Sequence, residues 1–428
     1  MANADLDVLV SGAGAAGLAA AAALGRAGKS VLVLEARDRI GGRCWSLSEP
    51  GLPMPVELGA EFIHGRPAAT LSLMRRAGIA AVARTGGGWY TEHGRLEPTG
   101  EIFTEIRKAI RKAGAPKKDV SFEAYLAREL RQLSPRARTF ARRRVEGYDA
   151  ADPARASARA IVEEWSGEDD AIAASHYRPS GGYGALLDWL AGTLDRDRVR
   201  LELQTIVHGV KWKRGSVVVE GTASGRPFRA SAARALLTLP FGVLQSGAVR
   251  FTPALGEKRR ALRGLAPSPV LKVALRFRTA FWEALDGGRY ENATFFRSLE
   301  APFPSFWTAL PVRVPLLIAW TGGPRAARLS GTGAPEIIRQ AVKSLKTVFG
   351  ARAGRLEAAY VHDWQADPYA CGAYSYVTVG GVGARKALAA PLRDTLYFAG
   401  EATDETEAGT VAGALQSGTR AAREILAG

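Results

Sequence analysis

The chain has little cysteine and histidine: only two cysteines, Cys44 and Cys371, and five histidines occur in 428 residues. Isolated cysteines exclude a disulfide framework, and neither lies in a CxxC motif or a Cys/His cluster that would bind zinc. We therefore expect no metal site and a cytoplasmic protein. The longest run without charge, residues 8–25, is interrupted by three glycines and preceded by aspartates. These features argue against a membrane anchor and a signal peptide.

Acidic residues are the minority, with 42 Asp and Glu against 58 Lys and Arg, a formal charge of +16. This excess raises the hypothesis of a nucleic-acid-binding protein. The basic residues are densest over residues 107–159, in "IRKAIRKAGAPKK" and "RARTFARRR", without aromatic residues at a stacking spacing. We predict a solvated helical face here and no specific nucleic-acid site. The one acidic cluster, "VEEWSGEDD" (162–170), predicts a solvated loop, with a position beside a substrate cavity as the alternative.

The N-terminal segment contains the first chemical motif. "DVLVSGAGAAGLAAAAALGRAGKSVLVLE" predicts a buried strand, a GxGxxG turn at Gly12, Gly14 and Gly17, an Ala-rich helix and a second strand that ends at Glu35. Glycines at this spacing permit a tight turn and close approach of a pyrophosphate, and an acid about 20 residues further on binds ribose hydroxyls. The segment therefore predicts a dinucleotide site. "RIGGR" (39–43) adds a second glycine turn and a guanidinium, which suits a further contact to a pyrophosphate.

The C-terminal segment points to the same ligand. "TLYFAGEATDETEAGTVAGALQSGTRAARE" predicts a strand, a turn with Gly400 and Glu401, and a helix that starts near Gly409. The helix N-terminus at Thr410 and Val411 would present unpaired N–H groups and the positive end of a dipole. Such a site stabilises the charge that develops on a reduced flavin.

A lysine interrupts the strand-like segment "PVLKVALRF" (269–277). The burial of an unpaired ammonium lowers the free energy of unfolding by several kcal/mol. Lys272 therefore either reaches solvent from a wet strand face that it shares with Arg276, or holds something inside the protein.

The sequence resembles the FAD-dependent amine oxidases, which include monoamine oxidases, polyamine oxidases and the flavin histone-lysine demethylases. "LEARDRIGGR", "ELGAEFIHG", "TLPFGVL", "LKVALRF" and "YFAGEAT" occur in the family's order, and their details are most similar to polyamine oxidases. The resemblance covers about the first 65 residues, about 238–282, and 361 to the end, whereas residues 86–175 show little of it.

The motifs and the resemblance together imply an FAD site. The expected cofactor-binding residues are Gly12, Gly14, Ala15, Ala16, Gly17, Glu35, Ala36, Arg37, Gly41, Gly42, Arg43, Gly59, Ala60, Glu61, Phe62, Val207, Trp364, Gly400, Glu401, Gly409, Thr410 and Val411. Mammalian monoamine oxidases attach FAD through a cysteine at the position of Ala373, so the resemblance implies non-covalent FAD here.

The resemblance also implies the reacting end of the site. In the family a lysine at the position of Lys272 holds a water against the flavin N5, and Trp364 and Tyr374 match rings beside the flavin face. Thr410 stands where monoamine oxidases have a second tyrosine, so the aromatic cage is half open. We expect Lys272, Tyr374, Trp364, Thr410, His64 and Glu61 to be the catalytic residues.

Two of these residues come from "ELGAEFIHG" (57–65), which resembles the segment that lines the substrate entrance of polyamine oxidases. His64 lines that entrance or is a hydrogen-bonded structural histidine. Glu61 could attract a cationic amine. The segment lacks the arginine with which L-amino-acid oxidases bind a carboxylate, which argues against that activity.

The expected reaction is oxidation of a neutral primary or secondary amine by hydride transfer to flavin N5. The imine hydrolyses to an aldehyde or ketone and an amine, and dioxygen is reduced to hydrogen peroxide. The charge of +16 should repel a polycation, which favours a monoamine unless an acidic funnel exists. Alternatives are an L-amino-acid oxidase, a dehydrogenase or desaturase of a non-amine, and a nucleic-acid-binding flavoprotein.

The length and the motifs predict an α/β fold in two parts. Residues 1–85, 200–265 and 390–428 are expected to form a discontinuous Rossmann-like FAD-binding domain. Residues 86–199 and 266–389 are expected to form an α+β substrate domain of sheet and helices, as in monoamine oxidases. Dioxygen as the electron acceptor is implied by the resemblance and is not fixed by the residues themselves, and the sequence fixes neither the particular amine nor the oligomeric state.

Overall fold

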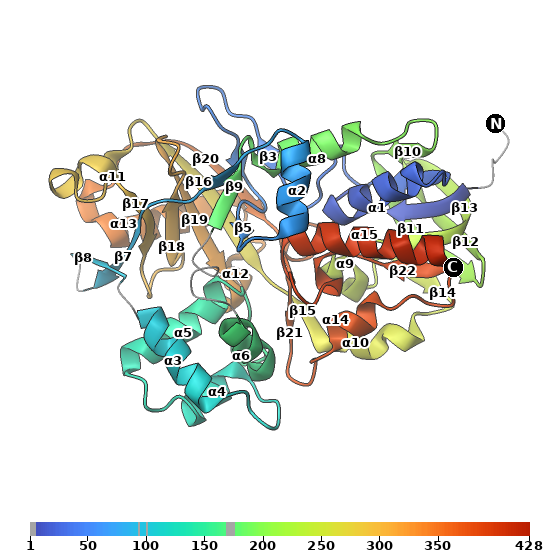
Figure 1. Cartoon of the computed structure of the whole chain (residues 1–428). Helices are drawn as coiled ribbons and strands as arrows, with labels where there is room; N and C mark the ends of the chain where they lie inside the picture. Colours follow the sequence, from blue (N-terminus) through green and yellow to red (C-terminus); the bar gives the residue numbers. More distant parts are fainter. Residues whose placement is uncertain (1–5, 93–94, 100–101, 168–175) are drawn as a thin grey trace.

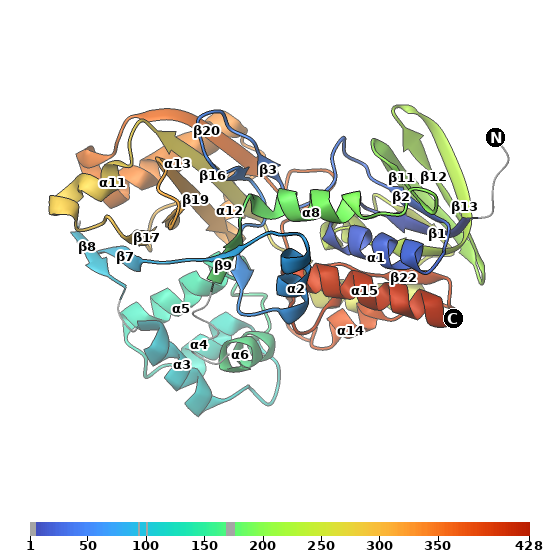
Figure 2. The ribbon, with the colours of Figure 1, turned by 45° about the horizontal axis from the view of Figure 1, so that its top comes forward.

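Two large β-sheets occupy the two ends of the molecule, and a group of four helices lies beside one of them (Figure 1). The computed structural model describes residues 6–92, 95–99, 102–167 and 176–428. The same three parts are distinct after rotation in Figure 2, where the sheet that contains both β1 and β13 lies on the right. The predicted α/β fold class is confirmed.

The first sheet has eight strands in the order β10-β2-β1-β13-β12-β11-β14, with β22 also paired to β13. Strands β10, β2, β1, β13 and β22 pair in parallel. The carboxyl ends of parallel strands meet at one edge, so the predicted glycine turn and Glu35 come together there. The strands are β1 (Leu6–Ser11), β2 (Val31–Leu34), β10 (Val199–Glu202), β11 (Thr205–Lys213), β12 (Ser216–Ala223), β13 (Arg226–Leu237), β14 (Arg250–Thr252) and β22 (Leu396–Phe398).

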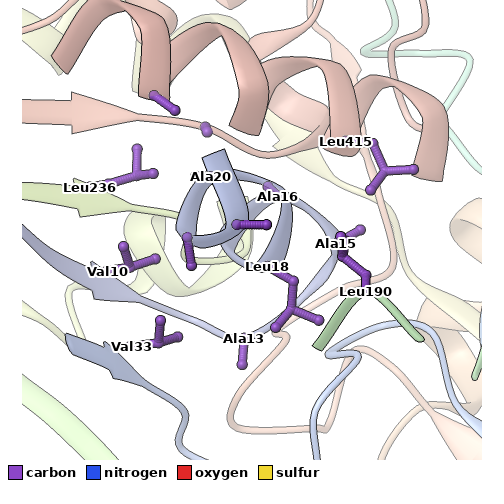
Figure 3. Close-up of a cluster of buried hydrophobic side chains, with 14 of the residues drawn as sticks. Val10, Ala13, Ala15, Ala16, Leu18, Ala20, Val33, Leu190, Leu236 and Leu415 are labelled. Carbon is purple, nitrogen blue, oxygen red and sulfur yellow. The ribbon is translucent and has the colours of Figure 1, made fainter. Parts of the chain in front are cut away.

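Helices from both ends of the sequence cover one face of this sheet. Helix α1 (Ala15–Arg26) lies against α15 (Val411–Ala427) and α8 (Gly182–Gly192), and the apolar side chains between them form one buried core (Figure 3). The many alanines of α1 allow this close approach, because they add little bulk between helix and sheet. The start of α1 is thereby fixed by the last helix of the chain.

A glycine in α15 marks the tightest contact between these helices. A Cβ at Gly418 would lie 2.1 Å from the carbonyl oxygen of Ala16, which is backbone and cannot move aside. We expect Gly418→Ala to lower the free energy of unfolding by about 1–3 kcal/mol in denaturant titrations. Gly192→Ala is the control, because nothing lies within 4 Å of its Cβ position. Equal stabilities of the two variants would contradict this account.

The second sheet has seven strands in the order β20-β16-β19-β18-β17-β7-β8. Alternate residues of β16 from Leu271 to Phe277 pack into a core with α13 (Ala334–Phe349), so Lys272 points to the opposite face. The strands are β7 (Gly87–Glu92), β8 (Arg95–Pro98), β16 (Val270–Phe277), β17 (Ala293–Arg297), β18 (Ser305–Thr308), β19 (Leu316–Gly322) and β20 (Leu356–Asp363).

The four-helix group has its own core and accounts for the basic part of the sequence. It consists of α3 (Ile102–Ala113), α4 (Phe122–Arg128), α5 (Pro135–Gly147) and α6 (Ala158–Gly167). The expectation of a solvated basic face is wrong for Arg107, Arg143 and Arg144, which line the central cavity described below. Amphipathic helices in one bundle direct some of their basic residues inward when a cavity lies there.

Short elements connect these parts. Three two- or three-stranded sheets pair β3 (Ser46–Leu47) with β4 (Val56–Glu57), β15 (Leu265–Pro267) with β21 (Ser375–Val377), and β9 (His176–Pro179) with both β5 (Ile63–His64) and β6 (Ala81–Ala83). The remaining helices are α2 (Ala68–Arg76), α9 (Phe241–Ser246), α10 (Arg259–Gly264), α11 (Phe281–Ala284), α12 (Gly323–Leu329) and α14 (Ala384–Ala389), with single 3₁₀ turns at Gly256–Lys258, Leu285–Gly288, Gly350–Arg352 and Glu401–Thr403. The domain boundaries given above stay a proposal. Within the described ranges, no helix is both long and apolar enough to span a bilayer.

Candidate active site

A cavity of about 1760 Å³ lies between the two large sheets and the helix group. It is lined by residues from the two ends of the chain and from its middle. All of the residues predicted for cofactor binding and catalysis contribute to its lining, except Gly17. A Cβ on Gly17 would lie 1.9 Å from the carbonyl oxygen of Gly12, so this glycine permits the helix to approach the turn.

The two glycine turns meet at one end of the cavity. Gly14 and Gly41 form an isolated β-bridge, and the Gly41 N–H donates to the carbonyl oxygen of Ala13 at 2.9 Å. Gly12 and Gly41 have φ angles of +111° and +96°, which suit only glycine. Helix α1 begins directly after Gly14 without a side-chain cap, so its first N–H groups stay available to a ligand anion.

Glu35 is held at the end of β2 by backbone donors. Its Oε2 accepts the N–H of Ala13 at 2.8 Å and its Oε1 accepts the N–H of Arg37 at 2.9 Å. A carboxylate has about four lone-pair sites, so roughly half stay free for hydroxyl donors. Val207, which lies on strand β11 of the same sheet, also lines the cavity.

Ion pairs join the early and late parts of the sequence around this end of the cavity. Arg37 Nη2 lies 2.8 Å from both carboxylate oxygens of Asp367, and Arg43 Nη1 lies 3.0 Å from Glu401 Oε1. Arg43 also donates to the carbonyl oxygen of Ala373. Burial raises the pKa of Glu401, but Arg43 and Arg385 shift it below its usual value. The carboxylate therefore stays ionised and fixes the guanidinium of Arg43.

Lys272 is buried, with 1% of its surface exposed, so the wet-face interpretation is wrong. Its Nζ donates to Glu61 Oε2 at 2.8 Å and to the carbonyl oxygen of Gly59 at 3.0 Å. An ammonium has three N–H donors, and the described residues provide no acceptor for the third. Lys272 lines the cavity, where a water or a cofactor edge would complete its hydrogen bonds.

Glu61 has no free carboxylate oxygen. Oε1 accepts from Arg178 Nε at 2.8 Å, Oε2 accepts from Lys272, and the Trp307 indole N–H lies within 3.1 Å of both oxygens. Burial raises the pKa of Glu61, but Lys272 and Arg178 lower it to about 2. Its charge is already neutralised by two cations. We therefore no longer expect Glu61 to attract a substrate cation. We propose instead that Glu61 positions Lys272.

The predicted aromatic residues lie at the same part of the cavity. Tyr374 donates its hydroxyl to the carbonyl oxygen of Tyr148 at 2.6 Å, and the Trp364 indole donates to the carbonyl oxygen of Leu58 at 3.0 Å. These bonds fix both side chains. The Cβ position of Gly409 lies 3.6 Å from the Tyr374 ring, an ordinary van der Waals distance, so the φ of +72° favours glycine here more than the lack of space does.

Thr410 caps the last helix, as its predicted position at the helix N-terminus implies. Its hydroxyl accepts the N–H of Gly413 at 3.0 Å and donates to the carbonyl oxygen of Glu407 at 2.7 Å. Because both functions of the hydroxyl are used, the contribution we propose for Thr410 is the orientation of the helix N-terminus toward the cavity.

His64 meets a histidine that the sequence did not suggest. His64 Nδ1 lies 3.1 Å from His176 Nδ1, so one ring donates and the other accepts. Burial, followed by Arg144 and Arg84, lowers the pKa of His64 to about 4. Burial, followed by His64 and Arg84, lowers the pKa of His176 to about 3. Both rings are therefore neutral at neutral pH, which the shared hydrogen bond requires.

The histidine pair predicts a pH dependence of stability. Between about pH 4 and the ordinary histidine pKa of 6.5, the unfolded chain binds protons at these positions that the folded protein does not. Stability should therefore fall as the pH falls through this window. We expect His176→Gln to reduce this slope by roughly one proton in denaturant titrations at several pH values. An unchanged slope would contradict the assignment, and the exposed His208 serves as control through His208→Gln.

Several cavity residues were missed by the sequence analysis. Tyr148 and Trp307 hold predicted site residues, and three arginines, Arg84, Arg144 and Arg297, line the cavity. The predicted solvated loop over the acidic cluster is wrong for residues 162–167, which belong to α6 and place Glu163 and Glu164 at the cavity. Residues 168–170 of that cluster lie outside the described residues. No local motif marks these positions, because they come together only through the tertiary fold.

Comparison with known proteins defines the class to which this fold and cavity belong. The family model for flavin-containing amine oxidoreductases matches residues 15–426, so the chain belongs to that family. A human lysine-specific histone demethylase 2 is 28% identical over 98% of this chain and 53% of its own length. Polyamine oxidase 3 of Oryza sativa is 28% identical over 97% of this chain and 88% of its own.

Solved structures show the same fold. A putrescine oxidase bound to putrescine has a TM-score of 0.82 at 24% identity, with 99% of both chains covered. A cyclohexylamine oxidase from Brevibacterium oxydans has a TM-score of 0.80 at 23% identity, with 98% of both chains covered. The chain spans between 30% and 58% of the length of these histone demethylase relatives.

Proposed function

We propose that this protein is an FAD-dependent amine oxidase that uses dioxygen as its electron acceptor. The observation that supports this most directly is the buried ammonium of Lys272, which has one N–H free to bond within the cavity. The dinucleotide-type glycine turns line the same cavity. A buried cation of this kind suits a redox centre, since it stabilises negative charge that forms nearby.

The residues at the glycine-rich end fit FAD. The φ of +111° at Gly12, the uncapped start of α1 and the free acceptor sites of Glu35 suit a pyrophosphate and a ribose. Ala373 stands where a covalent link would need a cysteine. Cys44 also lines the cavity, but burial raises the pKa of its thiol to about 12, so it is not a nucleophile at neutral pH. Binding is therefore proposed to be non-covalent.

Bound FAD would supply the hydride acceptor that no side chain can provide. The protein's own residues would orient the amine and exclude water. Tyr374 and Trp364 form an apolar wall whose orientation is fixed by hydrogen bonds to the backbone. Desolvation against such a wall lowers the pKa of a bound ammonium and exposes the nitrogen lone pair. The imine product then hydrolyses to an aldehyde or ketone.

The decisive experiment begins with purification of the protein with FAD. The yellow holoprotein is titrated without oxygen with benzylamine, butylamine, putrescine, spermine and leucine while the flavin absorbance is recorded. Bleaching by an amine, followed by hydrogen peroxide release when oxygen is admitted, is the expected result. A protein that binds FAD but is bleached by no amine would refute the proposal and favour a dehydrogenase or desaturase of another substrate.

A further inference from the structure

Three arginines converge on the substrate part of the cavity from three separate elements. Arg84 follows β6, Arg144 lies on α5 and Arg297 ends β17. The Arg84 and Arg297 guanidiniums lie 4.9 and 4.4 Å from the centre of the Phe295 ring, and that of Arg144 lies 4.3 Å from the centre of the Tyr148 ring. Aromatic faces therefore support all three cations.

None of these three arginines forms an ion pair or a side-chain hydrogen bond with the part of the chain that the structure describes. Nε of Arg84 and Nε of Arg144 are buried without a partner there. Burial, followed by the charges of Arg84 and Arg144, lowers the pKa of Arg297 to about 10. Arg37 and Arg43, which line the same cavity, by contrast each pair with a carboxylate. An unpaired cluster of cations is costly, so its donors point to an anionic ligand.

The arginines lie close to the expected reaction centre. Arg144 stacks on Tyr148, whose carbonyl oxygen holds the Tyr374 hydroxyl. Phe295, which supports the other two arginines, lies 6.4 Å from Phe62 between ring centres. Phe62 directly follows Glu61, the partner of Lys272. A substrate that reaches these arginines would therefore extend only a few bonds beyond Tyr374.

Acidic side chains in this part of the cavity do not cancel the cluster. Burial, followed by repulsion from Glu164, raises the pKa of Asp149 well above its usual range, which favours the neutral form of Asp149. Glu163 and Glu164 line the cavity on α6. Glu164 shares a hydrogen bond with Asp149, and neither glutamate forms an ion pair with the three arginines. The positive charges of Arg84, Arg144 and Arg297 therefore remain in excess.

We propose that the substrate amine also carries an anionic oxygen group, a carboxylate or a phosphate, which Arg84, Arg144 and Arg297 bind. This inference rests on the proposed function and names the class of amine. Guanidiniums present planar N–H donors that match such groups. The three cations also repel a protonated amine, so they favour the neutral amine that oxidation requires. A carboxylate is thus recognised here without an arginine in the "AEFI" segment.

The test compares amines of similar size that differ in charge. Leucine, 4-aminobutanoate and O-phosphoethanolamine are compared with butylamine and putrescine, with the rate of flavin bleaching as readout. We expect one anionic amine to react fastest, and the three anionic compounds distinguish an α-carboxylate, a distant carboxylate and a phosphate. Arg84→Gln, Arg144→Gln and Arg297→Gln should each raise KM for that compound roughly tenfold to a hundredfold. KM for butylamine should not rise, because butylamine has no anionic group for the arginines to bind.

The control variant is Arg214→Gln, whose side chain is 80% exposed and lies outside the cavity lining. It should leave both KM values unchanged. A preference for putrescine over every anionic amine, together with unchanged KM values in the three cavity variants, would overturn the inference.

A second measurement separates this inference from the proposed function. The holoprotein is titrated with 4-methylpentanoate or inorganic phosphate, neither of which is oxidised, and with the uncharged 4-methylpentanamide. Saturable perturbation of the flavin spectrum by an anion alone, weakened at least tenfold in the arginine variants, supports the anion site even if no amine is oxidised. Absence of anion binding in a protein that oxidises amines refutes the anion site and leaves the proposed function intact.

Discussion

Replacing Lys272 with methionine should slow the reoxidation of the reduced protein by dioxygen roughly a hundredfold or more. The reason is the loss of a buried cation beside the proposed redox centre, since a neutral methionine side chain cannot replace its charge. Stopped-flow mixing of the reduced holoprotein with oxygenated buffer measures this rate. Folding should persist, because Arg178 and Trp307 still donate to Glu61.

Lys258→Met is the matched control for this prediction. Lys258 is also buried, with 2% exposure, but it donates to the carbonyl oxygens of Ala387 and Ala390 outside the cavity lining. Its replacement should lower stability and leave reoxidation unchanged. Lys272→Arg should recover part of the rate, since it restores the charge with a different shape. Equal reoxidation rates for Lys272→Met and the unmodified protein would show that Lys272 does not act in the reaction with dioxygen.

Replacing Glu35 with glutamine should weaken FAD binding roughly tenfold to a hundredfold. Both carboxylate oxygens accept backbone N–H groups, so an amide would set one of its own N–H groups against a donor. The variant also loses one of the two acceptor oxygens that could bind the ribose hydroxyls. Titration of the apoprotein with FAD, followed by the change in flavin fluorescence, measures the dissociation constant.

Asp38→Asn provides the comparison, because Asp38 is exposed three positions further along and does not line the cavity. It removes the same charge from the same turn. Equal FAD affinity of Glu35→Gln and Asp38→Asn would show that Glu35 acts only through its charge, or not at all, and would contradict the proposed ribose contact.

The cofactor end of the site was predictable because its information is local. A strand, a glycine turn and an acid within about 30 residues specify where Gly12 and Glu35 lie relative to each other. Lys272 was predictable for another reason, since a charge in an otherwise apolar strand needs a partner. The identity of that partner was not, because Glu61 lies 211 positions away in the sequence.

The proposed substrate end of the cavity was not predictable from local patterns. Arg84, Arg144 and Arg297 are three of 58 basic residues, and nothing in their neighbouring sequence distinguishes a cavity residue from a surface residue. Arg144 in particular lies in "RARTFARRR", where only the packing of α5 decides which side chain turns inward. The role of Glu61 was not predictable for the same reason. The sequence suggested that Glu61 attracts a substrate cation, but its partners Arg178 and Trp307 come from distant segments.

The pairs Arg37–Asp367 and Arg43–Glu401 join positions 330 and 358 residues apart. During synthesis on the ribosome, the first glycine turn emerges long before its carboxylate partners exist. The cofactor end of the cavity can therefore form only after nearly the whole polypeptide has been translated. Contacts between residues so far apart in the sequence also form slowly. FAD should accordingly bind after translation is complete. A chain truncated before residue 367 should not bind FAD and should stay colourless, even with FAD in excess.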